Sequence, residues 1–216
     1  MFPLGMPLLP GRLLPLRIFE PRYVALLRHC LQQESPEFGV VLIERGFEVG
    51  GGDQRTLIGT VAGILEAVPR PTGDFSVISY GRRRLRILEW LPDDPHPWAT
   101  VEDWPDFDQD DIDINDSDSP YRRLVEQSLT RVESLLQLIG PGQRENEILE
   151  RLREALDTSN PTQFSFAVAG LVPFGAADEF RLLRCPGVIE RLQTMEELFD
   201  DLEAVLKFQQ ENGPLN

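Results

Sequence analysis

The spacing of the apolar residues along this chain changes once, near residue 105. Before that point they fall into short β-rich runs, such as 38–43 and 57–65, which Gly, Pro and Asp residues separate. After residue 119 they recur every three or four positions, as on one face of a helix. The residues between, 106–119, hold many aspartates and few large apolar side chains. This change predicts a strand-rich domain over residues 1–105, a solvated acidic linker over 106–119 and a helical subdomain over 120–212.

The first half of the chain predicts six short strands and one early helix. Strands are expected at 38–43, 57–65, 75–80, 84–89 and 98–102, with a further strand in the opening segment 2–19. Pro3, Pro7, Pro10 and Pro15 lack an amide donor, so they confine strands in the opening segment to short pieces or to sheet edges. Pro21 suits the first turn of a helix. We therefore predict an α+β fold that begins with a small, partly closed β-barrel.

The second half predicts a compact helical bundle that follows the barrel. Its helices carry apolar stripes at Leu124, Leu129, Val132, Leu136 and Ile139, then at Ile148, Leu149, Leu152 and Leu156, and then at Phe164, Val168 and Leu171. Asn160 and Pro161 form an N-cap and first-turn pair for the third of these helices. The run Thr194-Met195-Glu196-Glu197 has the form of a capping box, which predicts the start of a final helix there.

Charge and cysteine content narrow the classes of function. The formal net charge is −15, which argues against binding to nucleic acid or to an anionic membrane, because both need a basic surface. No apolar run approaches the roughly 18 residues that span a bilayer, and the first residues lack the charged region of a signal peptide. The two cysteines, Cys30 and Cys185, make no disulfide framework. We therefore expect a cytoplasmic protein with two buried thiols.

Several ordered blocks of the sequence resemble the Lon N-terminal domain, also called the Lon substrate-binding domain. The most specific block is residues 14–23, Leu-Pro-Leu-Arg-Ile-Phe-Glu-Pro-Arg-Tyr, and others are 38–42, 48–51, 58–62, 81–87 and 161–165. The resemblance covers most of the chain. It implies a barrel related to the pseudouridine-synthase and archaeosine-transglycosylase (PUA-like) type, followed by helices. It also implies a module that recognises polypeptides in front of a protease or as a free-standing protein.

The chain lacks the catalytic parts of a Lon protease. Its one lysine is Lys207, and Leu206 precedes it, so the sequence has no Gly-Lys-[Ser/Thr] phosphate-binding loop. A Ser–Lys dyad needs a desolvated lysine, whereas Lys207 lies among polar residues near the end of a predicted helix. We therefore expect a stand-alone, non-enzymatic, proteolysis-related module without a cofactor. It would bind unfolded or apolar polypeptide segments, or one dedicated protein partner.

Other chemistry receives weaker support from the sequence. His29 and His96 are far apart in the chain, and no second Cys/His pair completes a zinc site with His29 and Cys30. A hydrolase would need a deep pocket that holds one of the histidines beside a nucleophile. Asp106, Asp108 and Asp110 have the first spacings of a calcium loop, but the Gly and the final Glu of that loop are missing. We expect no metal site.

The opening segment supplies the candidate binding residues. Its apolar side chains lie in a turn-rich stretch, and adaptable apolar surfaces suit a groove that accepts varied chains: Phe2, Leu4, Met6, Leu8, Leu9 and Leu13. These residues are also compatible with edge-strand core. Arg17, Glu20, Arg22 and Tyr23 are predicted to form a structural knot of hydrogen bonds, and a direct role in ligand binding is the alternative for the three charged residues. In the run Arg82-Arg83-Arg84, one arginine is expected to point inward and pair with an acid such as Glu20. The alternative function is a small-ligand or RNA-associated PUA-like accessory module.

Overall fold

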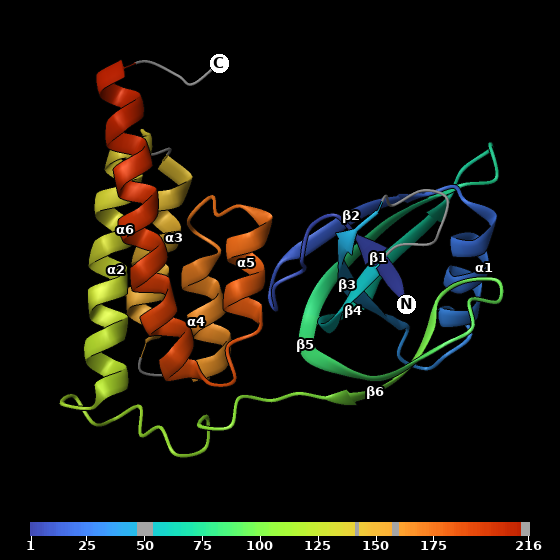
Figure 1. The fold of residues 1–216 in the computed structure, drawn as a ribbon, viewed down its shortest axis with the longest axis horizontal. Coiled ribbons are helices and arrows are strands. Elements are labelled where there is room, and N and C mark those ends of the chain that lie inside the picture. The colour runs from blue at the N-terminus through green and yellow to red at the C-terminus, as the bar shows by residue number, and fades with distance from the viewer. Residues whose placement is uncertain (47–53, 141–142, 157–159, 213–216) are drawn as a thin grey trace. The chain divides into compact units, whose positions relative to one another are not determined.

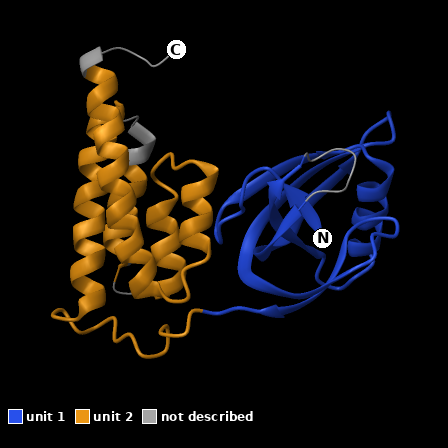
Figure 2. Cartoon of the chain, in the orientation of Figure 1, with its two compact units in different colours: residues 1–105 blue, residues 106–216 orange. Residues whose placement is uncertain are grey.

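The computed structural model describes residues 1–46, 54–140, 143–156 and 160–212. The chain divides into two compact units, residues 1–105 and residues 106–216 (Figure 2).

The charged residues are divided unevenly between the two units. Unit 1 carries 11 arginines against 13 acidic residues, whereas unit 2 carries 10 basic residues against 23 acidic ones. Almost all of the negative net charge therefore belongs to unit 2.

Unit 1 is a mixed sheet of six described strands with one described helix, α1 (Figure 1). Its elements are β1 Phe2–Leu4, β2 Leu13–Ile18, α1 Pro21–Cys30, β3 Glu37–Arg45, β4 Gln54–Pro69, β5 Phe75–Leu91 and β6 Trp98–Asp103. The strand order is β1-β3-β4-β5-β2, and β6 pairs with β5 off this path. The β1–β3 pair is parallel and the other pairs are antiparallel.

The two prolines of the opening strands lie where a missing amide does least harm. β1, with Pro3, and β2, with Pro15, are the two ends of the strand path. The predicted α+β class is confirmed, and so is the edge position of the opening strands. Over the described residues the sheet is not closed into a barrel, because no pairing joins these two end strands.

β5 is one strand of 17 residues, whereas the sequence predicted two short strands with a break at residues 81–83. The register against β4 shifts there instead, between Val61 and Ala62, so the irregularity is a bulge and not a turn. Gly81 is required at the bulge because a Cβ atom at that position would lie 2.4 Å from the Leu9 carbonyl oxygen. A bulge and a glycine look like a loop in the sequence, although the chain continues as a strand.

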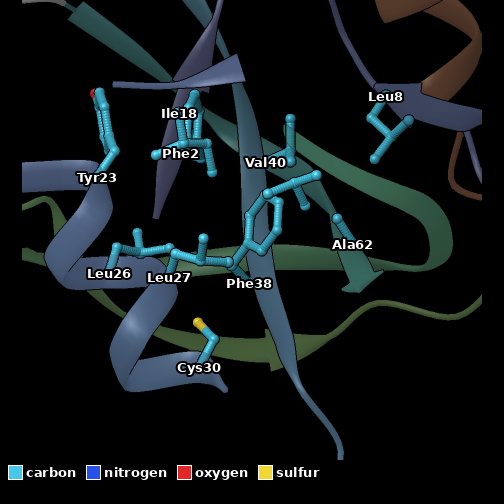
Figure 3. Packing of buried hydrophobic residues seen from close by; sticks show 11 residues of the cluster. Phe2, Leu8, Ile18, Tyr23, Leu26, Leu27, Cys30, Phe38, Val40 and Ala62 are labelled. Atoms are coloured by element: carbon cyan, nitrogen blue, oxygen red, sulfur yellow. The ribbon is translucent and has the colours of Figure 1, made fainter. Parts of the chain in front are cut away.

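The core of unit 1 lies between the sheet and α1. Figure 3 shows Leu26, Leu27 and Cys30 on the side of α1 that faces Phe2 and Phe38. Phe2 also stacks on Tyr23, with ring centroids 4.2 Å apart. Each of these side chains is buried, so α1 is held by its apolar face, as the helical spacing after Pro21 predicted.

The described part of unit 2 consists of five helices. These are α2 Pro120–Ile139, α3 Gln143–Ala155, α4 Pro161–Ala169, α5 Ala176–Leu183 and α6 Val188–Asn212. Ser119 caps α2 by accepting a hydrogen bond from the Arg122 amide, and Asn160 caps α4 by accepting one from the Gln163 amide. Across both units, no helix in the described ranges has the length and apolarity that crossing a membrane requires.

The final helix begins six residues before the predicted capping box. α6 starts at Val188, so Thr194 lies inside it, and the capping-box prediction is wrong. The N-terminal cap comes from a distant part of the chain, because the Asp108 carboxylate accepts hydrogen bonds from the Val188 and Ile189 amides at 2.8 and 3.0 Å. A carboxylate at this place also complements the helix dipole.

The acidic stretch 106–119 is not a solvated linker at its beginning. Asp106 and Asp108 are buried in unit 2, and Asp106 pairs with the fully buried Arg191. Thr162 donates a further hydrogen bond to Asp106 at 2.6 Å. The two carboxylates are therefore occupied by a guanidinium and by a helix N-terminus, which accounts for the burial of groups that composition alone places in water.

Candidate functional site

Three of the six predicted contact residues are part of the protein interior. Phe2, Leu8 and Leu9 are buried, and Phe2 and Leu8 belong to the core cluster of unit 1, so they are not available to a partner. The prediction of a contact surface is wrong for these three residues. Leu4 is half-buried against the same cluster. Met6 and Leu13 are 58% and 66% exposed, so their role in binding stays a prediction.

The predicted knot separates into two arrangements. Arg22 donates to Glu20 at 3.0 Å and its guanidinium lies 4.5 Å from the centre of the Tyr23 ring. Arg17, on β2, donates instead to Asp74 at 2.7 Å. Arg17 and Thr72 together hold the pKa of the Asp74 carboxyl at about 2, with the Thr72 hydrogen bond the larger cause. These contacts fix the start of α1 and the turn between β4 and β5. They join residues of unit 1 to one another, so they have a structural role.

The arginine run 82–84 is also engaged within unit 1. Arg84 points inward, as expected, and stacks on Trp104 with its guanidinium 4.2 Å from the ring centre. Arg82 and Arg83 both donate to Glu37, because the β5 bulge brings these neighbouring side chains to the same acid. The Arg83 hydrogen bond lowers the pKa of Glu37. The predicted partner of the inward arginine, Glu20, bonds to Arg22 instead.

One feature of unit 1 that has the form of a binding site is a pocket of about 220 Å³ between α1, the start of β3 and β6. Its floor is apolar, from Leu26, Phe38 and Ala99. The full lining comprises Met1, Leu26, His29, Cys30, Gln33, Glu37, Phe38, His96, Trp98, Ala99 and Val101. Along α1 the lining residues are Leu26, His29 and Cys30, whose spacing places them on one side of the helix. The pocket lining is therefore mainly apolar, with some polar side chains among the apolar ones.

The pocket brings together the two histidines that are distant in the sequence. The His96 and His29 rings lie 4.5 and 5.4 Å from the Trp98 ring, between centroids. His96 is buried, and this burial lowers its pKa. Sequence reasoning missed this cluster because its members belong to α1 and to the segment before β6, which meet only through the fold. The sequence held one indication of this cluster: in the pair Pro97-Trp98, a large aromatic residue stands at the start of a strand.

The chemistry of this cluster is weak for catalysis. Burial raises the pKa of the Cys30 thiol, so the nucleophilic thiolate is disfavoured. Within the described residues, no hydrogen bond joins Cys30 to either imidazole. The same ranges contain no group of three His, Cys, Asp or Glu side chains arranged to hold a metal ion. The pocket therefore shows no arrangement for nucleophilic catalysis or metal binding within the described residues.

Comparison with known proteins places this chain among relatives of one protease. Residues 1–201 match the family described as the ATP-dependent protease La (LON) substrate-binding domain. The chain belongs to this family. The resemblance that residues 14–23 and the strand blocks indicated is therefore confirmed. The pocket described above lies in the N-terminal part of this LON substrate-binding domain.

Two curated relatives of this LON substrate-binding domain are Lon proteases. The chain is 24% identical to Lon protease 1 of Syntrophobacter fumaroxidans over 214 residues, which are 95% of the chain and 24% of that protein. It is 30% identical to Lon protease of Anaeromyxobacter dehalogenans over 95 residues, 43% of the chain and 11% of that protein. The chain thus spans about a quarter or less of the length of these relatives.

Two solved structures share the fold of this LON substrate-binding domain. One is a Lon N-terminal domain protein from Xanthomonas campestris, with a TM-score of 0.61 and 23% identity, covering 91% of this chain and 95% of that one. The other is the N-terminal domain of a Mycobacterium avium complex Lon protease, with a TM-score of 0.61 and 18% identity, covering 91% and 94%. At these identities the likeness establishes the fold alone.

Proposed function

We propose that unit 1 binds exposed apolar segments of polypeptides, in the cytoplasm, and that this chain carries out no reaction of its own. The observation that supports the proposal is the apolar pocket between α1 and β6. Met6 and Leu13, the exposed members of the predicted apolar set, are candidates for a second contact. The clients would be unfolded chains or one dedicated protein partner.

The size of the pocket supports a side chain as its occupant. Sites for drug-sized ligands and cofactors generally measure about 300 to 1,000 Å³. At about 220 Å³ this pocket has room for one or two large apolar side chains. Leu26, Cys30 and Phe38 would supply apolar contact, and the Trp98 ring would cover part of the guest. Burying a Leu or Phe side chain in this way contributes about 1.5 to 3 kcal/mol.

A non-enzymatic role agrees with the surroundings of Lys207 and of Cys30, the thiol in the pocket lining. Lys207 lies on α6, is mostly exposed and pairs with Glu203 one helical turn away. A lysine in this position keeps its charge in water and is a poor base. Cys30 is buried with a raised pKa. Neither residue has the activation that nucleophilic or general-base chemistry requires.

The arginines of unit 1 favour a polypeptide over RNA. Arg82 and Arg83 are paired with Glu37, and Arg84 is buried against Trp104. An RNA site needs guanidinium groups that can replace counterions along a phosphate backbone. In unit 1 these guanidinium groups instead contact side chains of the domain itself. The alternative, a small-ligand or RNA-associated module, therefore receives less support than peptide recognition.

Binding can be tested with a carboxymethylated, permanently unfolded protein and the same protein in its native fold. We expect saturable binding of the unfolded form alone, measured by calorimetry. Val101→Ser removes an apolar lining residue that is 41% exposed, and should weaken binding about tenfold. Leu65→Ser, at an exposed β4 position outside the pocket, is the matched control and should leave the affinity unchanged.

A second pair of variants tests the opening segment. Met6→Ser and Leu13→Ser change exposed side chains without opening the core. A loss of affinity would include this segment in the contact surface. No saturable binding of any unfolded chain up to millimolar concentration would remove the proposed function.

A further inference from the structure

We propose that an extended peptide adds to the sheet along the outer edge of β6, with one large apolar side chain in the pocket and a lysine or arginine beside it. This inference rests on the proposed function and specifies its binding mode and the chemistry of the client. It follows from the position of the pocket, from the composition of the three sheet edges and from the charges at the rim.

The pocket lies at the edge of β6 and not above one of its faces. Successive side chains of a strand point to opposite faces of the sheet. Trp98 lies on one face and Ala99 and Val101 on the other, yet all three line the pocket. A cavity that touches both faces must reach the strand from its side. β5 occupies one side of β6, so the pocket lies on the opposite side, where none of the described strands pairs.

The composition of the sheet edges singles out β6. The end strands β1 and β2 each contain a proline, which removes an amide donor and hinders the addition of another strand. β6, Trp-Ala-Thr-Val-Glu-Asp, has no proline and keeps all six amides, and its central residues suit a strand. Prolines therefore hinder pairing at β1 and β2, whereas β6, which also has one described neighbour, contains no proline.

The available edge has the length of a short peptide strand. At its end, Asp103 is tied to Arg83, which also bonds to Glu37 at the start of β3. The β6 residues that precede this bridge in the sequence are 98–102. At roughly 3.3 Å per residue the stretch measures about 17 Å, which matches a strand of five residues. Addition of a strand to such an edge provides main-chain hydrogen bonds, and the pocket selects a side chain.

Charge at the rim favours a basic neighbour of the apolar anchor. Asp94 accepts a hydrogen bond from the Trp98 indole through its main-chain oxygen, and Glu34 follows the lining residue Gln33. Over the described residues, neither carboxylate is in an ion pair. Arg28, the arginine of α1 that is nearest in sequence to His29, lies about 200° around the helix from the lining residue Leu26. Unpaired carboxylates on residues next to the lining would attract a cationic side chain of the client, and burial lowers the pKa of the Met1 amine in the lining to about 6, which reduces its competing positive charge at neutral pH.

The binding mode can be tested without altering the protein. The probe is a nine-residue peptide of Thr and Val with a central Leu and a Lys on each side of that Leu. An added strand pairs with β6 through one of its two edges, and the amides on that edge alternate along the peptide with those on the other edge. N-methylation of the amides on the pairing edge should weaken binding at least about tenfold, whereas N-methylation of the other set should change the affinity little. Amide hydrogen exchange in residues 98–102 should slow when the unmethylated peptide is bound.

The outcomes separate this inference from the proposed function. Equal affinities for the peptide and for both methylated forms, with Val101→Ser still weakening each of them, would overturn strand addition and leave the peptide-binding pocket intact. No binding of any form, and none of unfolded protein, would overturn both. Replacing the two lysines with Glu should weaken binding about tenfold, and the Glu34→Gln, Asp94→Asn double variant should remove that preference. A preference that persists in the double variant would overturn the electrostatic part of the inference.

Discussion

Asp106 and Arg191 form an ion pair in which neither side chain is exposed to solvent. The guanidinium also donates to Ser165 and lies 3.8 Å from the centre of the Phe166 ring. Asp106 accepts a further hydrogen bond from Thr162, so both charges are enclosed by polar partners. Three segments of unit 2 that are distant in sequence therefore meet at this pair: the start of the acidic stretch, α4 and α6.

Removing one partner of this pair should strongly destabilise unit 2. Asp106→Asn or Arg191→Met would leave a buried charge without compensation, which costs about 3 to 5 kcal/mol. The measurement is urea denaturation followed through the helical circular dichroism signal. Asp106→Leu combined with Arg191→Met should cost less than the sum of the single changes. Arg131→Met, in a partly exposed pair with Asp200, is the control and should cost about 0 to 1 kcal/mol. Equal effects at the two sites would contradict the role of burial.

Asp108 should behave as the N-cap of α6. Asp108→Ala would leave the Val188 and Ile189 amides without their acceptor and should lower the free energy of unfolding by about 1 to 2 kcal/mol. Asp110→Ala changes an exposed neighbour and provides the comparison. Faster amide hydrogen exchange confined to the first turn of α6 would accompany the loss. Unchanged exchange there would show that Asp108 does not cap the helix.

Gly59 should tolerate no side chain. A Cβ atom at this position would lie 2.1 Å from the Val40 carbonyl oxygen, which belongs to the backbone of β3 and cannot rotate away. Gly59→Ala is therefore expected to separate β3 from β4 locally and to destabilise unit 1 by several kcal/mol, on the order of other severe steric changes. Gly175→Ala has no atom closer than 3.9 Å and should change stability little. Thermal unfolding of both variants measures the difference.

The Cys30 thiol should report on the pocket through its reactivity. Burial raises the pKa of this thiol above its ordinary value of 9.0, so less thiolate is present at any given pH. Alkylation of Cys30 in the Cys185→Ser variant should therefore be slower than that of a free thiol, and its rate should still rise at a pH where the free thiol has levelled off. Mass spectrometry follows both rates. A bound peptide should slow the reaction further, and a rate profile like that of free cysteine would contradict the burial.

The opening segment shows what local pattern can establish. The prolines at positions 3 and 15 predicted strand edges, and β1 and β2 are edges, because a missing amide is a local property. The start of α1 after Glu20 and the cap at Asn160 were predictable for the same reason. The prediction of a surface role for Phe2, Leu8 and Leu9 was wrong, since burial depends on what packs against a residue and not on its neighbours in sequence.

The candidate site could not be predicted because its parts meet only through the fold. His29 and His96 are separated by 67 positions, and the sheet brings α1 and β6 together around them. Asp106 and Asp108 resembled solvated acids because their partners, Arg191 and the first amides of α6, come about 80 residues later. The break predicted within β5 failed for a related reason, since a bulge is specified by the opposite strand.

The uneven charge of the two units has a colloidal consequence. Unit 1, which has the pocket and the apolar side chains Met6 and Leu13, is close to neutral, so it adds little to the electrostatic repulsion between copies of the chain. Unit 2 carries a large excess of acid, and two copies of the chain repel each other chiefly through it. Such repulsion reaches only about 8 Å at physiological ionic strength. The chain should therefore remain dispersed at neutral pH and moderate salt, and should self-associate as the pH approaches its isoelectric point near 4.5.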